Sequence, residues 1–118
     1  MFPDKGEKNV ILDFSAMETQ VIPHFKGGEK EVAAQMYNDD LCRILRLQLA
    51  PGASVGEHTH EDSAEIIFAL EGEAVVLYDG REERLVAGQC HYCPKGHTHT
   101  LRNEGPADFA AYAVVPQQ

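Results

Sequence analysis

Four side chains of the 118-residue sequence have the types and spacing to bind a metal ion: His58, His60, Glu65 and His99. Three imidazoles and one carboxylate are a donor set that first-row divalent metals favour. In a chain of which 43% of the residues are hydrophobic, so many metal-type donors are rarely gathered by accident. We therefore predict a metal centre.

The strands that carry these residues must bring them together. Successive side chains of a strand point to opposite faces, so His58 and His60 project to the same side. Glu65 has the opposite parity, and a turn at residues 61–63 would let it face the two imidazoles from the neighbouring strand. His99 follows the turn signal at residues 94–96 and would close the site. Four ligands from three strands would leave a six-coordinate ion roughly two positions for water or substrate.

Glycine, proline and asparagine residues frame the four donors at fixed spacings. The first run is Gly52, five residues, His58, one residue, His60, four residues, Glu65, six residues, Gly72; the second is Gly88, five residues, Pro94, one residue, Gly96, two residues, His99, three residues, Asn103. These runs resemble the two signature motifs of the cupin superfamily. The fifteen residues between Gly72 and Gly88 resemble its short, microbial-type spacer.

The resemblance, to a small single-domain cupin of the conserved-barrel (cupin 2) type, implies a fold and a metal site but leaves the reaction open. It implies a jelly-roll barrel, also called a double-stranded β-helix, with one divalent transition metal ion: Fe, Mn, Ni, Zn or Cu. The superfamily includes dioxygenases, sugar isomerases and epimerases, lyases, decarboxylases and proteins that only bind ligands. Its small members often pair, so we also expect a homodimer.

The rest of the chain has an all-β pattern. Alternation of apolar and polar residues predicts a hairpin of residues 32–36 and 45–49, and a tight reversal at residues 71–73 between strands 66–70 and 74–78. Asp79-Gly80 is the strongest turn signal, and further strands are predicted at 83–86, 89–93, 99–103 and 109–115. We expect an N-terminal segment over residues 1–30, with an edge or dimer-exchanged strand at Val10 to Phe14, and the barrel over residues 31–118.

Composition excludes some classes of partner. The formal charge is −9, the pI is near 5.0, and only ten basic residues are present, so nucleic acid and anionic membrane are unsuitable partners. No apolar stretch reaches the ~20 residues that span a bilayer, and residues 1–8 are charged, unlike a signal peptide. We expect a cytoplasmic protein whose partner is a small-molecule substrate or ligand.

Other histidines and some pocket residues allow alternatives. His97, two residues before His99, could be a fifth metal donor, an acid/base group or only a rim residue. His24 and His91 are interpreted as surface or packing histidines. Four further side chains could line a pocket, although strand parity does not choose the inward face: Tyr92, Phe68, Arg46 and Gln48.

The three cysteines do not form a disulfide framework, because their number is odd. Cys90 and Cys93 form a CxxC pair, which is interpreted as two structural, reduced thiols, with redox and metal-binding roles as alternatives. Cys42 is interpreted as core packing.

These patterns support three hypotheses. The first is a metal-dependent enzyme of the dioxygenase or isomerase type that acts on a small oxygen-rich molecule. The second is a non-catalytic binding or sensor module for a sugar or organic acid, although the chain has no helix-turn-helix segment expected of a regulator. The third is a structural barrel in which the metal only stabilises the fold.

Overall fold

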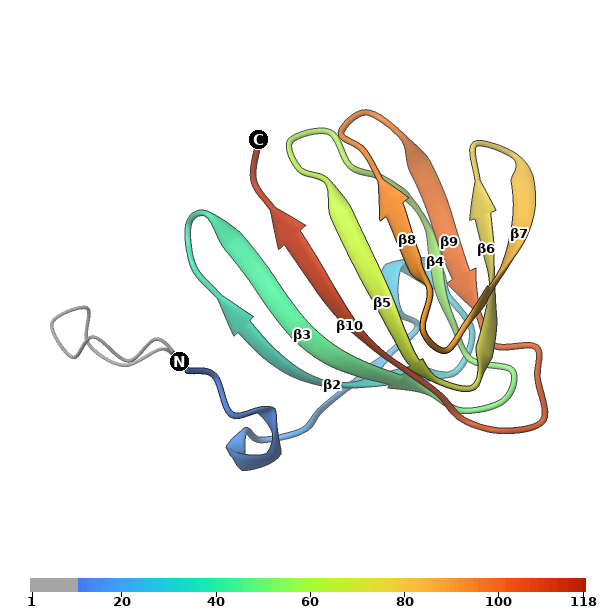
Figure 1. Ribbon diagram of the computed structural model, residues 1–118, viewed down its shortest axis with the longest axis horizontal. Coiled ribbons are helices and arrows are strands. Elements are labelled where there is room, and N and C mark those ends of the chain that lie inside the picture. The colour runs from blue at the N-terminus through green and yellow to red at the C-terminus, as the bar shows by residue number, and fades with distance from the viewer. Residues whose placement is uncertain (1–10) are drawn as a thin grey trace, which may run out of the picture.

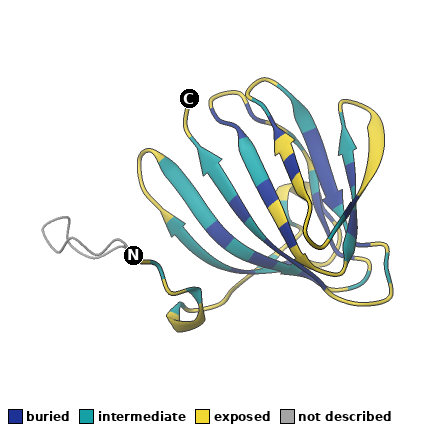
Figure 2. Cartoon of the chain, in the orientation of Figure 1, coloured by how far each residue is buried: buried dark blue, intermediate teal, exposed yellow. Residues whose placement is uncertain are grey.

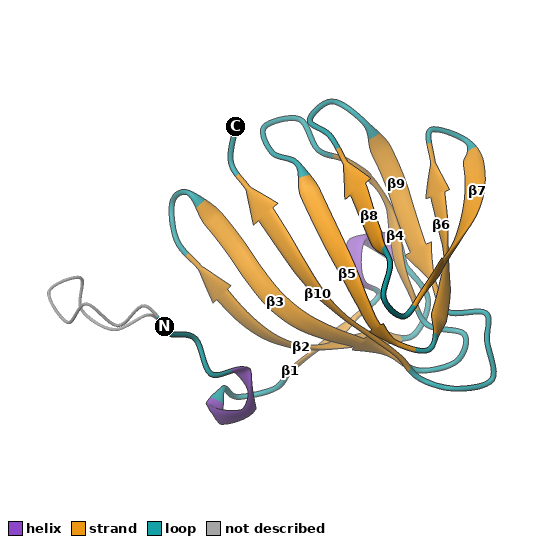
Figure 3. Ribbon diagram, in the orientation of Figure 1, coloured by secondary structure: helices purple, strands orange, loops and turns teal. Residues whose placement is uncertain are grey.

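The computed structural model describes residues 11–118, which fold into two antiparallel β-sheets that face each other (Figure 1). The larger sheet has the strand order β1-β2-β3-β10-β5-β8, and the smaller has the order β4-β9-β6-β7. The strands are β1 (Gln20–Pro23), β2 (Glu31–Asn38), β3 (Cys42–Leu49), β4 (Ser54–Thr59), β5 (Glu65–Glu71), β6 (Glu73–Tyr78), β7 (Arg81–Val86), β8 (Cys90–Cys93), β9 (Thr98–Arg102) and β10 (Phe109–Pro116). Figure 3 shows how completely strands dominate the chain, which confirms the predicted jelly-roll.

The core lies between the two sheets because one face of most strands is apolar. In β3, Leu45, Leu47 and Leu49 are buried and alternate with more exposed neighbours. Phe109 of β10 and Ile67 of β5 are also fully buried among them. Figure 2 shows the buried segments gathered in the middle of the strands of both sheets. Burial of this alternating pattern selects the register of each strand, because a slip by one residue would expose the whole apolar face.

Both predicted hairpins with strong turn residues are present. The β2–β3 turn is closed by Asp39, whose Oδ1 accepts hydrogen bonds from the backbone nitrogens of Leu41 and Cys42, each at 2.8 Å. The β6–β7 turn is formed by Asp79 and Gly80, with φ angles of 48° and 85°. Two successive positive φ angles match the right-handed twist of the paired strands, which confirms the turn predicted from Asp79-Gly80.

The reversal at Gly72 has a different role from the hairpin turns. The chain turns there as predicted, but β5 lies in the larger sheet and β6 in the smaller one, so the two strands do not pair. Gly72 has a φ of 77°, and a β-carbon built on it would collide with the backbone carbonyl of Asp108. The turn therefore moves the chain between sheets at a point where only glycine fits without strain.

The N-terminal segment differs from its prediction. Residues 11–13 have no regular structure and Phe14–Ala16 form the 3-10 helix η2, so the strand predicted at Val10 to Phe14 is wrong for 11–14, while Val10 lies outside the described residues. The edge strand is β1 instead, paired with β2 from Gln20↔Ala34 to Pro23↔Glu31. A second 3-10 helix, η3 (Phe25–Gly27), follows and packs on β4. No helix in residues 11–118 has the length and apolar character needed to cross a membrane.

Candidate metal centre

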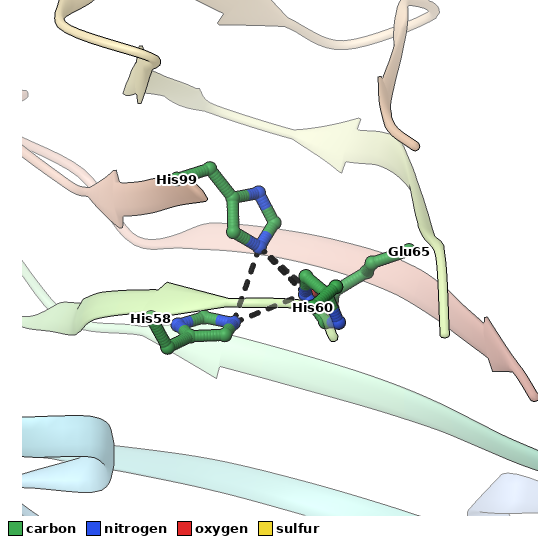
Figure 4. A group of neighbouring side chains, drawn as sticks. All are labelled: His58, His60, Glu65 and His99. Carbon is green, nitrogen blue, oxygen red and sulfur yellow. Dashed lines mark hydrogen bonds and ion pairs between the residues drawn. The ribbon is translucent and has the colours of Figure 1, made fainter. Parts of the chain in front are cut away.

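The four predicted donors meet at one end of the space between the sheets. His58 Nε2 and His60 Nε2 approach Glu65 Oε1 at 3.7 and 3.0 Å, and His99 Nε2 approaches the same oxygen at 3.0 Å. His99 Nε2 also lies 3.0 Å from His60 Nε2 and 3.2 Å from His58 Nε2. Figure 4 shows these side chains turned toward a common point. The sequence prediction that the four converge is confirmed by this geometry.

Three strands of both sheets position the cluster. His58 lies in β4 and pairs in register with His99 of β9, while His60 follows the last residue of β4. Glu65 begins β5, in the opposite sheet. The prediction that Glu65 lies on a neighbouring strand is therefore wrong: residues 61–64, of which the first two are exposed, carry the chain from one sheet to the other, and the carboxylate faces the imidazoles from the opposite sheet.

Hydrogen bonds on the far side of each ring orient the imidazoles. His58 Nδ1 donates to the carbonyl of Gly56 at 2.8 Å, so its Nε2 carries the lone pair that faces the cluster. His60 Nδ1 is 3.0 Å from the Ser63 hydroxyl, within the predicted turn. His99 Nδ1 is 3.0 Å from His91 Nε2. Each cluster histidine thus presents Nε2 inward and has a partner behind it, as metal-binding histidines usually do.

Glu65 supplies the negative charge of the cluster. Burial by itself raises the pKa of a carboxyl group, but the contacts with the imidazoles of His58, His60 and His99 outweigh burial and hold the pKa of Glu65 well below its usual range. The side chain is therefore an ionised carboxylate at neutral pH. Three imidazole nitrogens lie close to it. That of His58 carries no proton, so its lone pair could bind a metal ion.

These residues fit a divalent cation. Donors that share an ion at about 2.1 Å and at right angles lie about 3.0 Å apart, which is the separation of four of the five donor pairs described above to within 0.2 Å. Lone pairs directed at one another this closely repel unless a cation or protons lie between them. The donor set and its spacing therefore could hold one metal ion.

His91 is the residue of the site that the sequence analysis missed. The prediction of a surface or packing histidine is consistent with its burial but does not include its hydrogen bond to His99. Burial and the neighbouring His99 lower the pKa of His91 to about 4, so its ring is neutral at neutral pH. The alternation of residues along the strand is the feature that could have identified it. His91 and Cys93 are the two buried positions of β8, and Cys93 pairs in register with Glu65.

The side chain of His97 lies apart from the cluster, although its backbone carbonyl accepts a hydrogen bond from the nitrogen of His60 at 3.1 Å. Its Nδ1 is 3.0 Å from the Tyr78 hydroxyl and pairs with the Asp79 carboxylate, and its ring stacks on Tyr78. The pKa of Asp79 is lowered chiefly by that hydrogen bond. The structure thus brings His97 to the β6–β7 turn and not to the metal donors.

The cysteines of the CxxC pair point to opposite faces of β8. Cys90 is exposed, whereas Cys93 is fully buried, so they do not form a joint site. Burial, reinforced by the charges of Glu65 and Asp79, raises the pKa of Cys93 to about 11 and keeps it a thiol. Its sulfur lies with ring nitrogens of His91 and His99 in a second group of donor-type atoms that shares His99 with the first. Cys42 is half-buried and free.

A small cavity of about 40 Å³ adjoins His58, Glu65 and His99. Its walls are largely apolar side chains of the core, among them Leu45, Leu47 and Ile67. A much larger groove, about 860 Å³, opens between β7 and β8 on the other side of His91 and contains none of the four donors. The small cavity therefore adjoins three of the four cluster residues, whereas the groove between β7 and β8 does not.

The residues predicted as pocket lining lie elsewhere. Tyr92 borders the larger groove, and Arg46 borders a depression beneath the N-terminal segment. Phe68 is 46% exposed and Gln48 binds Asp108 through a hydrogen bond of 2.9 Å. None of them reaches the small cavity.

Comparison with known proteins agrees with the fold. Residues 45–115 match the model of the Cupin domain. The chain is 29% identical over 117 residues to the oxalate-binding protein of Thermotoga maritima, covering 94% of this chain and 97% of that protein. It is 37% identical over 104 residues to the tetracenomycin polyketide synthase protein TcmJ of Streptomyces glaucescens, covering 86% of this chain and 70% of that protein.

Among solved structures, the crystal structure of a predicted oxalate decarboxylase from Thermotoga maritima superposes with a TM-score of 0.86 at 29% identity. The alignment covers 92% of this chain and 99% of the other. With the family match over more than half of the sequence, and with the two-sheet barrel and its histidine–carboxylate cluster in place, this chain belongs to the cupin family.

Proposed function

We propose that this protein binds one divalent transition metal ion through His58, His60, Glu65 and His99 and uses it to bind and transform a small oxygen-rich molecule. The observation that carries this proposal is the convergence of three Nε2 atoms and one carboxylate oxygen at separations near 3 Å. Candidate metals remain Fe, Mn, Ni, Zn and Cu, because this donor set accepts all of them. A bound ion would supply Lewis-acid polarisation of a ligand oxygen.

The residues around the ion would bind and orient the substrate. Glu65 contributes one negative charge, so a divalent ion would keep a net charge of about +1 for an anionic or polar ligand. The apolar walls formed by Leu45, Leu47 and Ile67 limit access of water. His91 holds the ring of His99 in place from behind.

The size of the cavity favours a substrate of only a few atoms. A volume of about 40 Å³ holds a few water molecules at about 10–15 Å³ each on this measure. Pockets for drug-sized ligands measure about 300–1,000 Å³. Together with the names of its relatives, an oxalate-binding protein and a predicted oxalate decarboxylase, this supports a small organic acid. We propose dioxygen-dependent chemistry or isomerisation as the reaction class.

The alternative is a binding module without turnover, which the name of the oxalate-binding relative favours. Metal-loaded protein supplied with oxalate and other small acids distinguishes the two. Consumption of oxygen or formation of product that is lost in His58→Ala supports the enzyme. Saturable binding without any product, in the presence of each candidate metal, supports the binding module and contradicts the enzyme.

We further propose that the protein forms a homodimer and lies in the cytoplasm. Large exposed apolar side chains on β5 and β8, Phe68, Leu70 and Tyr92, support an interface between two copies. Three free cysteines suit a reducing compartment. Light scattering at micromolar concentration tests the dimer, and a monomer throughout that range would contradict it.

A further inference from the structure

Two cationic side chains line the small cavity beside the metal donors, Arg43 and Lys26. Neither takes part in the proposed metal binding. The protein as a whole has a net charge of −9, which would repel an approaching anion at long range. Two cationic side chains beside one cavity contrast with this overall charge. Local positive charge in the cavity would add to the attraction of the metal ion for an anion at this point.

Arg43 reaches the cavity because of its place in β3. It has the same parity as Leu45, Leu47 and Leu49, which are buried in the core, so it extends the inward face of that strand toward its end. Its Nε donates to Asn38 Oδ1 at 2.7 Å, which fixes the plane of the guanidinium. No ion pair with a carboxylate of residues 11–118 involves Arg43. The terminal nitrogens are thus available to a ligand.

Lys26 reaches the same cavity from η3. That helix lies against β4 through two glycines: a β-carbon on Gly56 would collide with the Lys26 carbonyl, and one on Gly28 with the Ser54 carbonyl. Lys26 has a φ of 55°, and its Nζ lies 5.7 Å from the centre of the Phe25 ring. Phe25 also lines the cavity. The close backbone packing holds this lysine over the site, again without a carboxylate partner in the described chain.

We propose that Arg43, assisted by Lys26, is the specificity-determining residue that selects a small carboxylate anion for the cavity. The inference rests on the proposed function, since the other end of the anion would bind the metal held by His58, Glu65 and their partners. Guanidinium binds carboxylate with two parallel hydrogen bonds, which fixes the orientation of the anion as well as its charge. Neutral ligands of the same size would form weaker hydrogen bonds with both residues, because they carry no opposite charge.

Titration of cobalt-loaded full-length protein with oxalate, followed by the change in its visible spectrum, tests the proposal. Loss of one charged hydrogen-bonding partner weakens binding by about 10- to 100-fold, so Arg43→Gln should lower oxalate affinity by that factor. Arg43→Lys should recover part of the loss, and Lys26→Gln should produce a smaller one. Arg46→Gln is the matched control, because Arg46 lies in the same strand with the opposite parity and does not reach the cavity.

Cobalt affinity and melting temperature, measured on the same samples, separate selection of the anion from a structural effect. Both should be unchanged in Arg43→Gln. Equal oxalate affinity in wild type and Arg43→Gln, with cobalt bound in each, would overturn the role of Arg43 and leave the metal centre intact. Absence of cobalt from the wild-type protein would instead contradict the proposed function itself.

Discussion

His91 Nε2 lies 3.0 Å from Nδ1 of His99, so a buried histidine stands directly behind a residue of the candidate metal centre. Burial and the proximity of His99 keep the pKa of His91 near 4, and its ring is therefore neutral at neutral pH. With His99 Nδ1 as the hydrogen-bond donor, its Nε2 retains the lone pair that faces Glu65. This contact links the floor of the larger groove to the metal donors.

Replacement of His91 should weaken metal binding without removing a donor. Loss of a partner behind a metal ligand typically lowers metal affinity by about 10- to 100-fold, and we expect this for His91→Phe. His91→Gln, which keeps an acceptor, should lose less. Competition against a chelating dye measures both, with Tyr92→Phe as a control on the exposed face of β8. Unchanged affinity in His91→Phe would contradict a role in orienting His99.

Metal affinity should depend on pH through the histidines. The pKa of Glu65 is lowered, so this carboxylate is already ionised when imidazoles begin to release their protons on raising the pH. Protons and metal compete for the three rings, so affinity should be higher at pH 8 than at pH 5. Calorimetric titrations between pH 5 and pH 8 measure the slope. An affinity independent of pH over that range would show that the histidines are not ligands.

Gly56 should tolerate no side chain. A β-carbon there would collide with the backbone of Lys26, and the Gly56 carbonyl also accepts the hydrogen bond that orients His58. Gly56→Ala should therefore destabilise the fold by about 1–3 kcal/mol and weaken metal binding at the same time. Gly105→Ala is the control, because the nearest atom to its β-carbon would be 3.4 Å away on the flexible Glu73 side chain. Thermal unfolding with and without metal measures both effects, and equal behaviour of the two variants would refute the packing argument.

Asn103 should be important for stability. It is 1% exposed, and its Nδ2 donates to the carbonyls of Leu49 and Ala107 while its Oδ1 accepts from the nitrogen of Gly105, all at 2.9 Å. Asn103→Ala removes the buried hydrogen bond to the Leu49 carbonyl, at a cost of about 1–3 kcal/mol, and two part-buried ones. Asn103→Asp should be worse, since a carboxylate would face two carbonyl oxygens.

Urea denaturation compares these variants with Gln48→Ala, which removes one exposed hydrogen bond to Asp108. The control should lose less than about 1 kcal/mol. A comparable loss in Gln48→Ala and Asn103→Ala would contradict the assignment of Asn103 as a buried anchor.

The donors and the strands were predictable from the sequence because both depend on local spacing. Alternation identified β3, and the resemblance to two motifs identified His58, His60, Glu65 and His99. Parity could not reveal that residues 61–64 cross between sheets, because that crossing is set by packing of the whole barrel. The packing of the whole barrel also decides which face of β8 points inward, so the sequence alone did not identify His91 as a neighbour of the cluster. Four of the five residues from Val10 to Phe14 are apolar and favour a strand, but Asp13 among them caps η2, and pairing with β2 begins at Gln20.

Elemental analysis of the full-length chain, purified without added metal and then incubated in turn with Fe, Mn, Ni and Zn, tests the metal centre itself. We predict about one equivalent of bound metal for at least one of these ions, with a matching rise in melting temperature. The double variant His58→Ala/His99→Ala should lose that metal while it remains folded by circular dichroism. Less than about a tenth of an equivalent in the wild-type protein under every condition would contradict the metal centre.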